Sequence, residues 1–300
     1  MSDLKKAGLC AGWNLYTLRK NPRFYLALIM GFLLCWMLTD KTLHISRDFQ
    51  TDLQAFEAFI WCFADGDSIL YASLVLMLTL SAFPRLDAAG SYFSFRAGRR
   101  AWLLGQVLTV FIITLGYCLM LLLFSMLLSI GRANFASTWS DTATLLSFSP
   151  GGFDPAFAVS RRMVKLTLPY PALLQIFSLL FLYMLLMSAV QLAFTVMKSR
   201  KTGTAIALLI GLGGFIFTPE RFMLWLNLPR EFTFYANLLS AWLSPLQHAT
   251  FMMHSFGYDL LPRMHTSMLL LGGVSLLLLG LAAVRMRKYN YVFSGGISHD

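Results

Sequence analysis

Three histidines lie within one short segment of the sequence and are the residues best suited to binding a metal ion. His248, His254 and His265 share this segment with Asp259. Side chains on one helix face are three or four residues apart, so the spacing of His248 and His254 does not bring them into one ligand set. The segment holds no cysteine, and the chain holds no CxxC pair. We therefore expect structural histidines and no metal site.

The sequence also lacks the motifs of common catalytic sites. It contains no HExxH, no GxSxG and no pair of acids inside an apolar run. The phosphate-binding pattern GxxxxGK[ST] is missing as well, so the chain has no P-loop of its own for ATP. We therefore predict that the protein is not an enzyme, has no catalytic residues and binds no cofactor.

The composition indicates a membrane protein. Hydrophobic residues make up 57% of the 300 residues, charged residues only 13%, and the net charge is +10. Soluble domains carry about a quarter charged residues, so a soluble globular fold and a disordered chain are both excluded. In a membrane protein the positive charge reports topology, and it gives no reason to expect a nucleic acid partner.

Six apolar runs are long enough to cross a bilayer as helices, which takes roughly 17–25 residues each. Leu, Met, Ala and Phe dominate these runs, and none alternates with period two as a barrel strand would. We predict an all-α polytopic membrane protein, a single transmembrane domain over residues 1–300. The predicted spans are 24–39, 68–83, 101–131, 171–197, 203–217 and 267–284.

The charges predict the orientation of these spans. If the N-terminus is cytoplasmic, the inner segments carry 15 Lys and Arg but three acids, and the outer segments carry nine Lys and Arg but eleven acids. The inner side is then +12 and the outer side −2. Short cytoplasmic loops are rich in Lys and Arg, so both termini are expected in the cytoplasm. The inner segments are 1–23, 84–100, 198–202 and 285–300.

Residues 1–23 are expected to form an amphipathic helix on the inner membrane surface. Leu9, Trp13 and Tyr16 would share its apolar face and contact membrane lipids, and Pro22 would end the helix. An irregular tail is the alternative for this segment.

The segments expected outside differ in character. Residues 40–66 and 132–170 are expected to be two long, polar loops, and their role is not predicted. Residues 218–266 are too apolar for an ordinary loop and are interrupted by four prolines. We expect short re-entrant helices there, dipping into the outer leaflet where protein covers their free backbone groups.

The predicted spans contain few ionisable residues. Ion-coupled transporters and pumps usually place acids, His or Lys within their spans, so the energy for any transport is expected to come from outside the bilayer. Within the fifth span, Gly203, Ala207 and Gly211 form a stripe of small residues that permits close helix packing. The stripe suits packing within the chain and a subunit interface equally.

The segment 85–100, between the second and third spans, combines an acid, a glycine, aromatic residues and a basic cluster. Exposed aromatic side chains in a short loop need burial. They could lie on the membrane surface or enter a groove on another protein. The residues concerned are Asp87, Gly90, Tyr92, Phe93, Phe95, Arg96, Arg99 and Arg100.

This segment resembles the first cytoplasmic loop of the permease subunits of type-2 ATP-binding-cassette (ABC) exporters. In that family an acid, a nearby glycine, a short coupling helix and basic residues precede a Gly-Lys pair at the start of the third span. Asp87 stands where glutamate is usual, Gly90 and Gly105 match, and Gln106 replaces the lysine. The sequence 96–98 departs from a stretch that usually contains proline. The layout of surface helix, six spans and re-entrant helices is similar as well.

The resemblance implies a function and partners. The chain would be the permease of an exporter in a bacterial cell membrane. It would pair with a second permease chain, the same or similar, and with a separate ATPase subunit docked on residues 85–100. The cargo would be amphipathic or hydrophobic: a peptide, an antibiotic or a lipid-like molecule. The alternatives are a resistance, immunity or sensing protein of the same layout without transport, and an intramembrane enzyme.

Overall fold

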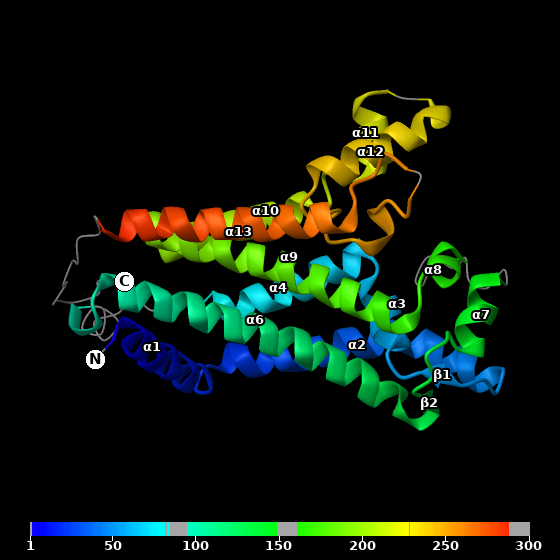
Figure 1. The fold of residues 1–300 in the computed structure, drawn as a ribbon, viewed down its shortest axis with the longest axis horizontal. Helices are drawn as coiled ribbons and strands as arrows, with labels where there is room; N and C mark the ends of the chain where they lie inside the picture. Colours follow the sequence, from blue (N-terminus) through cyan, green and yellow to red (C-terminus); the bar gives the residue numbers. More distant parts are fainter. Residues whose placement is uncertain are drawn as a thin grey trace.

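In the described part of the chain, four long helices form the body of the protein. Figure 1 shows them running along one axis. The computed structural model describes residues 2–81, 83–84, 95–148, 161–227, 229–257 and 259–287. Each of the four is long and apolar enough to cross a membrane, as predicted for these parts of the sequence. They are α2 (Pro22–Asp48), α6 (Arg99–Ser129), α9 (Pro169–Met197) and α13 (Met264–Arg287).

A bent pair of helices occupies the region of the second predicted span, 68–83. Helix α3 (Glu57–Phe63) and helix α4 (Gly66–Leu80) meet at an angle of 90°. The Asp65 carboxylate accepts a hydrogen bond from the Asp67 amide at 3.1 Å and caps α4. Counted as one broken span, the pair raises the number of candidate spans in the described chain from four to five.

The fifth predicted span, 203–217, coincides with a shorter helix, α10 (Arg200–Gly213). Ser199 accepts a hydrogen bond from the Thr202 amide and caps its start. Fourteen residues reach about 21 Å, less than the hydrocarbon core of a bilayer, because a helix rises 1.5 Å per residue. The prediction of six spans is therefore not confirmed by the described residues.

The N-terminal part of the chain consists of two helices in succession. Helix α1 (Asp3–Leu18) ends shortly before Pro22, which starts α2, and Asn21 caps α2 by accepting from the Arg23 amide at 3.0 Å. The prediction that 40–66 is a loop from its first residue was wrong. Helix α2 continues to Asp48. Its last turns are polar, but polar residues can form a helix, so the end of the apolar run is not the end of the helix.

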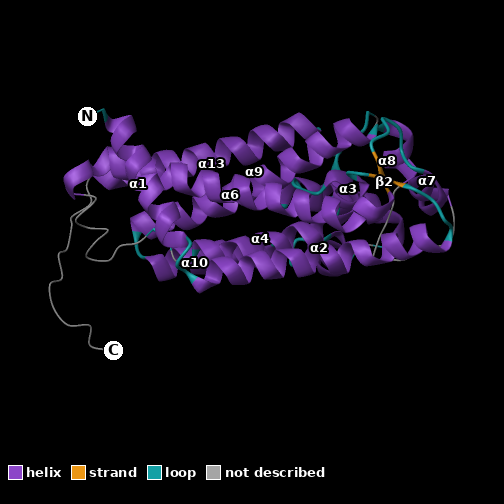
Figure 2. Cartoon of the chain, turned by 90° about the horizontal axis from the view of Figure 1, so that it is seen from below, coloured by secondary structure: helices purple, strands orange, loops and turns teal. Residues whose placement is uncertain are grey.

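The two long polar segments fold together at one end of the bundle. They contribute β1 (Leu53–Gln54) and β2 (Ala133–Asn134), which pair in parallel, with Leu53 beside Ala133. The 3-10 helix η1 (Ile130–Arg132) leads into β2. Two short helices, α7 and α8, complete this end, which we call the cap (Figure 2). Their bounds are Asp141–Phe148 and Arg161–Leu166.

The apolar segment 218–266 contains short helices, and none of them is a candidate span. Two of them, α11 and α12, pack against each other and project to the side of the bundle (Figure 1). Their exposed surface carries large apolar side chains, among them Leu224, Trp225 and Trp242. The elements are α11 (Pro219–Trp225), η3 (Arg230–Phe232), α12 (Thr233–Leu243) and η4 (Phe251–Met253).

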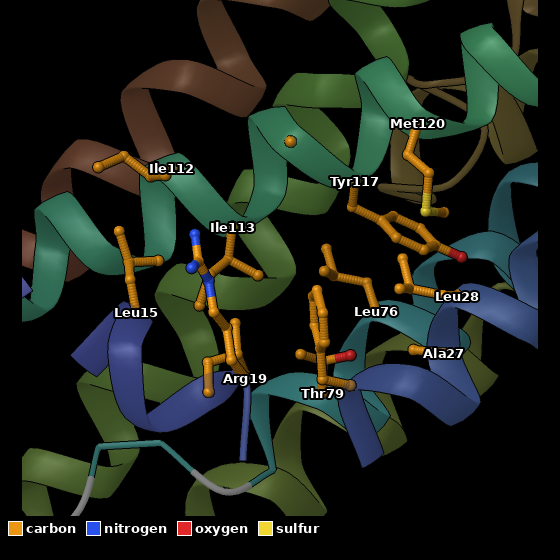
Figure 3. Close-up of a pocket in the computed structure, with 13 residues that line it drawn as sticks. Leu15, Arg19, Ala27, Leu28, Leu76, Thr79, Ile112, Ile113, Tyr117 and Met120 are labelled. Carbon is orange, nitrogen blue, oxygen red and sulfur yellow. The ribbon is translucent and has the colours of Figure 1, made fainter. Parts of the chain in front are cut away.

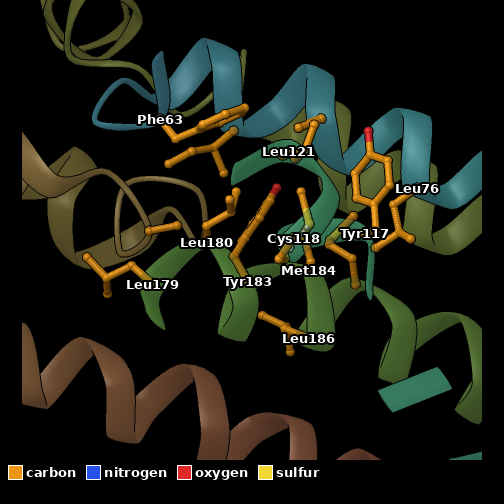
Figure 4. Close-up of a cluster of buried hydrophobic side chains, with 14 of the residues drawn as sticks. Phe63, Leu76, Tyr117, Cys118, Leu121, Leu179, Leu180, Tyr183, Met184 and Leu186 are labelled. Carbon is orange, nitrogen blue, oxygen red and sulfur yellow. Dashed lines mark hydrogen bonds between the residues drawn. The ribbon is translucent and has the colours of Figure 1, made fainter. Parts of the chain in front are cut away.

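Helix α9 lies at the centre of the core and contacts α3, α4, α6, α10 and α13. Tyr183 and Met184 of α9 are fully buried and face Cys118 and Leu121 of α6 (Figure 4). The Cys118 thiol lies 3.5 Å from the Met184 sulfur. Small and flexible side chains at this crossing let the two helices approach closely.

Candidate functional site

The predicted coupling segment lies only partly within the described chain. Asp87, Gly90, Tyr92 and Phe93 are outside the described residues. The others are within it: Phe95 and Arg96 lie in a short helical turn, and Arg99 and Arg100 are the first two residues of α6.

Gly98 joins this turn to α6. Its φ is +87°, a value that L side chains rarely adopt, so a glycine is required here. The Gly98 carbonyl accepts a hydrogen bond from the Trp102 amide at 2.9 Å and starts the helix. The sharp turn leaves the Phe95 side chain 69% exposed at the end of the bundle.

Positive charge gathers around this segment. The start of α6, the link from α9 to α10 and the end of α13 lie at the end of the bundle opposite the cap (Figure 1). Arg99 donates a hydrogen bond to the carbonyl of Arg287, which ties α6 to α13. Asp3 is the only acid that the described chain places here. The basic residues are Lys5, Lys6, Arg96, Arg99, Arg100, Lys198, Arg200, Lys201, Arg285 and Arg287.

Helix α1 packs along the first half of α6. A Cβ added at Gly105 would lie 2.6 Å from the Cys10 Cβ and 3.0 Å from the Ala7 carbonyl oxygen, so only glycine permits this approach. Ala7 and Ala11 of α1 are buried in the same contact. Gly105, which the sequence assigned to a family motif, therefore has a packing role in this fold.

A buried polar contact fixes the register of the two helices. The Asn14 side-chain amide donates to the side-chain oxygen Oε1 of Gln106 at 3.1 Å and to the Thr109 hydroxyl at 3.0 Å. All three side chains are buried, and leaving any of them unpaired there would cost free energy. The role of Asn14 was not predicted from the sequence, although a polar residue on the same helix face as Ala7 and Ala11 was a possible signal.

The opposite face of α1 is exposed and apolar. Leu9 is 65% exposed, Trp13 45% and Tyr16 53%. Lys20 lies over the Tyr16 ring, 4.8 Å from its centroid. These are the residues expected to contact membrane lipids, and the fold leaves their face uncovered.

Replacing Gly105 with leucine is expected to separate α1 from α6. The added side chain would overlap the α1 backbone, which cannot shift without breaking the Asn14 hydrogen bonds. The measurement is the rate at which Cys10 reacts with a maleimide, resolved by mass spectrometry. Burial raises the pKa of the Cys10 thiol, so the docked helix should react slowly and the variant at least about tenfold faster. Gly280→Leu, at an exposed glycine of α13 with open space around it, is the control. An unchanged Cys10 rate would contradict this packing.

The stripe of small residues on α10 faces other helices of the same chain. A Cβ at Gly203 would lie 2.3 Å from the Thr195 hydroxyl and 2.5 Å from the Gln191 carbonyl oxygen of α9. Ala207 is fully buried, and Gly211 lies against Met187. The structure thus places the stripe in a contact within the chain.

The two buried histidines, His248 and His254, make hydrogen bonds to different partners and do not form a common ligand set. The Trp242 carbonyl, 3.2 Å from His248 Nε2, requires a proton on that nitrogen, so Nδ1 accepts from the Ser267 hydroxyl at 2.9 Å. His254 Nδ1 donates to the Phe251 carbonyl at 3.3 Å. Burial lowers the pKa of both imidazoles and keeps them neutral near pH 7. No group of three potential ligands suited to a metal ion occurs in the described parts of the chain.

One buried acid, which no sequence pattern predicted, accepts hydrogen bonds from several residues of the cap. Glu57 is fully buried, and its carboxylate accepts hydrogen bonds from the Ser140 amide at 2.8 Å and the Ser140 hydroxyl at 2.5 Å. The backbone N–H of Gln54 donates to it at 3.3 Å. Glu57 and Ser140 are 83 residues apart, and no local pattern could have paired them.

Comparison with protein-family models, curated proteins and solved structures finds no match to this chain.

Proposed function

We propose that the protein is the permease subunit of an ATP-driven exporter of the type-2 ABC kind. Its positively charged end would face the cytoplasm of a bacterial cell, with both termini on that side. A separate ATPase subunit would dock on residues 85–100 and bind the ATP, and a second permease chain would complete the transport pathway.

The observation that carries this proposal is the way residues 95–100 continue into α6. The turn that presents Phe95 passes through Gly98 directly into that helix. Helices α1, α2 and α9 all pack on α6. A partner that binds the turn would therefore act on the helix that most of the bundle contacts, which is what a coupling element requires.

Two further features support the proposal. The basic residues concentrate at the end that would be cytoplasmic, in agreement with the positive-inside rule. Helices α11 and α12 expose a broad apolar surface, which suits the outer leaflet or a second permease chain. In this proposal α4 and α10 take the places of the second and fifth of the six predicted spans, although α10 by itself is shorter than the hydrocarbon core.

Replacing Phe95 with aspartate is expected to weaken ATPase binding without unfolding the chain. The proposal has the Phe95 ring enter an apolar groove of the ATPase, where a carboxylate would be desolvated without a partner. The matched control is Phe135→Asp, because Phe135 is also 69% exposed and lies at the cap. The measurement is co-purification with a P-loop ATPase, identified by mass spectrometry, and the ATPase activity of the complex.

We expect roughly a tenfold weaker complex for Phe95→Asp and an unchanged one for Phe135→Asp. Equal binding by both variants would remove the coupling role of this turn. Purification of the wild-type chain without any stoichiometric ATPase would overturn the exporter proposal itself.

A further inference from the structure

A cavity of about 360 Å³ lies where α1 ends and α2 begins. Residues from both helices line it, together with α4 and α6 (Figure 3). An engineered cavity of about 150 Å³ already holds benzene, and small-molecule sites start near 300 Å³. The space is therefore large enough for part of an alkyl chain.

The wall of the cavity is almost entirely apolar. Leu15 and Leu18 of α1, Leu28 of α2 and Ile113 of α6 contribute to it. Figure 3 shows the Tyr117 ring reaching from α6 toward Leu28 and forming part of the wall. The Tyr117 hydroxyl is buried and has no hydrogen-bond partner in the described chain. Such a lining favours hydrocarbon over a polar ligand.

One cationic side chain lies at this cavity. Arg19 follows the last residue of α1 and lines the space with its exposed side chain. Its guanidinium has no hydrogen bond or ion pair with another described residue. A guanidinium binds phosphate or carboxylate through two parallel hydrogen bonds, so an anionic group is its natural partner.

The cavity opens toward the surface that would face lipid. Ile112 and Gly116 line it from the exposed side of α6, which also carries exposed Leu108 and Leu119. A molecule entering from this side would pass along apolar side chains and reach Arg19 with its polar end. A phospholipid in the bilayer has this arrangement of chain and headgroup.

We propose that this cavity binds one acyl chain of an anionic phospholipid from the leaflet that faces the positively charged end, with the headgroup phosphate on Arg19. The bound chain would fill the space between α1, α2 and α6 and hold α1 against the bundle. This site does not require an ATPase subunit, so the test of lipid binding is independent of the test of the exporter function.

The test uses the full-length chain in nanodiscs of neutral phosphatidylcholine. The probe is phosphatidylglycerol with a photoactivatable diazirine in its acyl chain, and the reference probe is phosphatidylcholine with the same chain. Cross-linked peptides are mapped by mass spectrometry. We expect labelling of α1, α2 and α6 around the cavity. It should be roughly tenfold stronger for phosphatidylglycerol, because the choline cation of phosphatidylcholine offsets the charge of its phosphate near Arg19.

Two matched pairs of variants distinguish the effect of the Arg19 charge from the effect of the cavity volume. Arg19→Gln should remove the preference for the anionic lipid, whereas Lys20→Gln should not, because Lys20 lies over Tyr16. Gly116→Leu should abolish labelling by both lipids, since a Cβ there meets no atom within 4 Å and the side chain can fill the cavity. Gly280→Leu, at an exposed glycine of α13 with equal space, should change nothing.

The fold of each variant is checked by its thermal unfolding and by the protection of the buried Cys118 thiol. Equal labelling of the wild type by both lipids would overturn the proposal, and so would labelling that persists in Gly116→Leu. Displacement of the phospholipid probe by free palmitate would assign the cavity to a soluble fatty acid and would overturn the lipid assignment.

Discussion

Replacing Gly203 with valine is expected to lower the free energy of unfolding by about 3 kcal/mol or more. The first atom of the new side chain would overlap the Gln191 carbonyl oxygen at 2.5 Å and the Thr195 amide nitrogen at 2.8 Å. Both are backbone atoms of α9 and cannot move aside as a flexible side chain would. Helix α10 would have to separate from α9, which also breaks the buried contact of Ala207.

Thermal unfolding in detergent, followed by tryptophan fluorescence, measures this effect. Gly273→Val serves as the control, because Gly273 is an exposed glycine on α13 whose Cβ would meet no atom within 4 Å. An unfolding midpoint equal to that of the wild type would contradict the packing of α10 on α9. It would instead favour the alternative interpretation of the stripe, an interface between subunits.

Replacing Glu57 with alanine is expected to unfold the cap while leaving the rest of the bundle intact. The Gln54 amide, the Ser140 amide and the Ser140 hydroxyl would lose their acceptor in a site closed to solvent. Each unpaired buried donor costs about 1–3 kcal/mol, so the loss of the acceptor for all three lowers the stability of the cap by roughly 3–9 kcal/mol.

Reactivity of Cys62 gives a local measure of this change. Cys62 lies buried in α3, five residues after Glu57, and should become accessible to a maleimide when the cap opens. Asp141→Ala removes a different acid from the cap, one with an exposed side chain, and should leave Cys62 protected. Protection of Cys62 in both variants would show that the Glu57 hydrogen bonds do not hold the cap together.

The apolar runs predicted the long helices well, because burial in lipid demands an unbroken stretch of apolar residues. The predicted span 171–197 corresponds to Pro169–Met197, and 267–284 to Met264–Arg287. Hydropathy indicates which residues lie in an apolar environment, but it does not indicate where a helix ends. The polar last turns of α2, up to Asp48, were therefore predicted to be a loop. A short apolar run such as 203–217 can equally be a half-length helix packed on protein.

The contacts that build the candidate sites could not be predicted in the same way. Asn14 meets Gln106 across 92 residues, and Glu57 meets Ser140 across 83. Neither pair has a local pattern, because each depends on how two distant helices are placed in three dimensions. Arg19 directly follows α1 in the sequence, but the cavity beside it also needs residues of α2, α4 and α6, which lie far along the chain or in another helix.

The unbroken course of α6 has a mechanical consequence. At 31 residues it is a rod about 46 Å long, with Arg99 at one end and the cap at the other. Such a rod works as a lever: pivoting it by about 5° about its middle swings each end by about 2 Å in opposite directions. Helix α1 packs against one half of α6, and α2 packs against the other half. A small push on the turn that carries Phe95 would therefore be felt as an opposite displacement at Arg132 and Ser46, on the far side of the bundle.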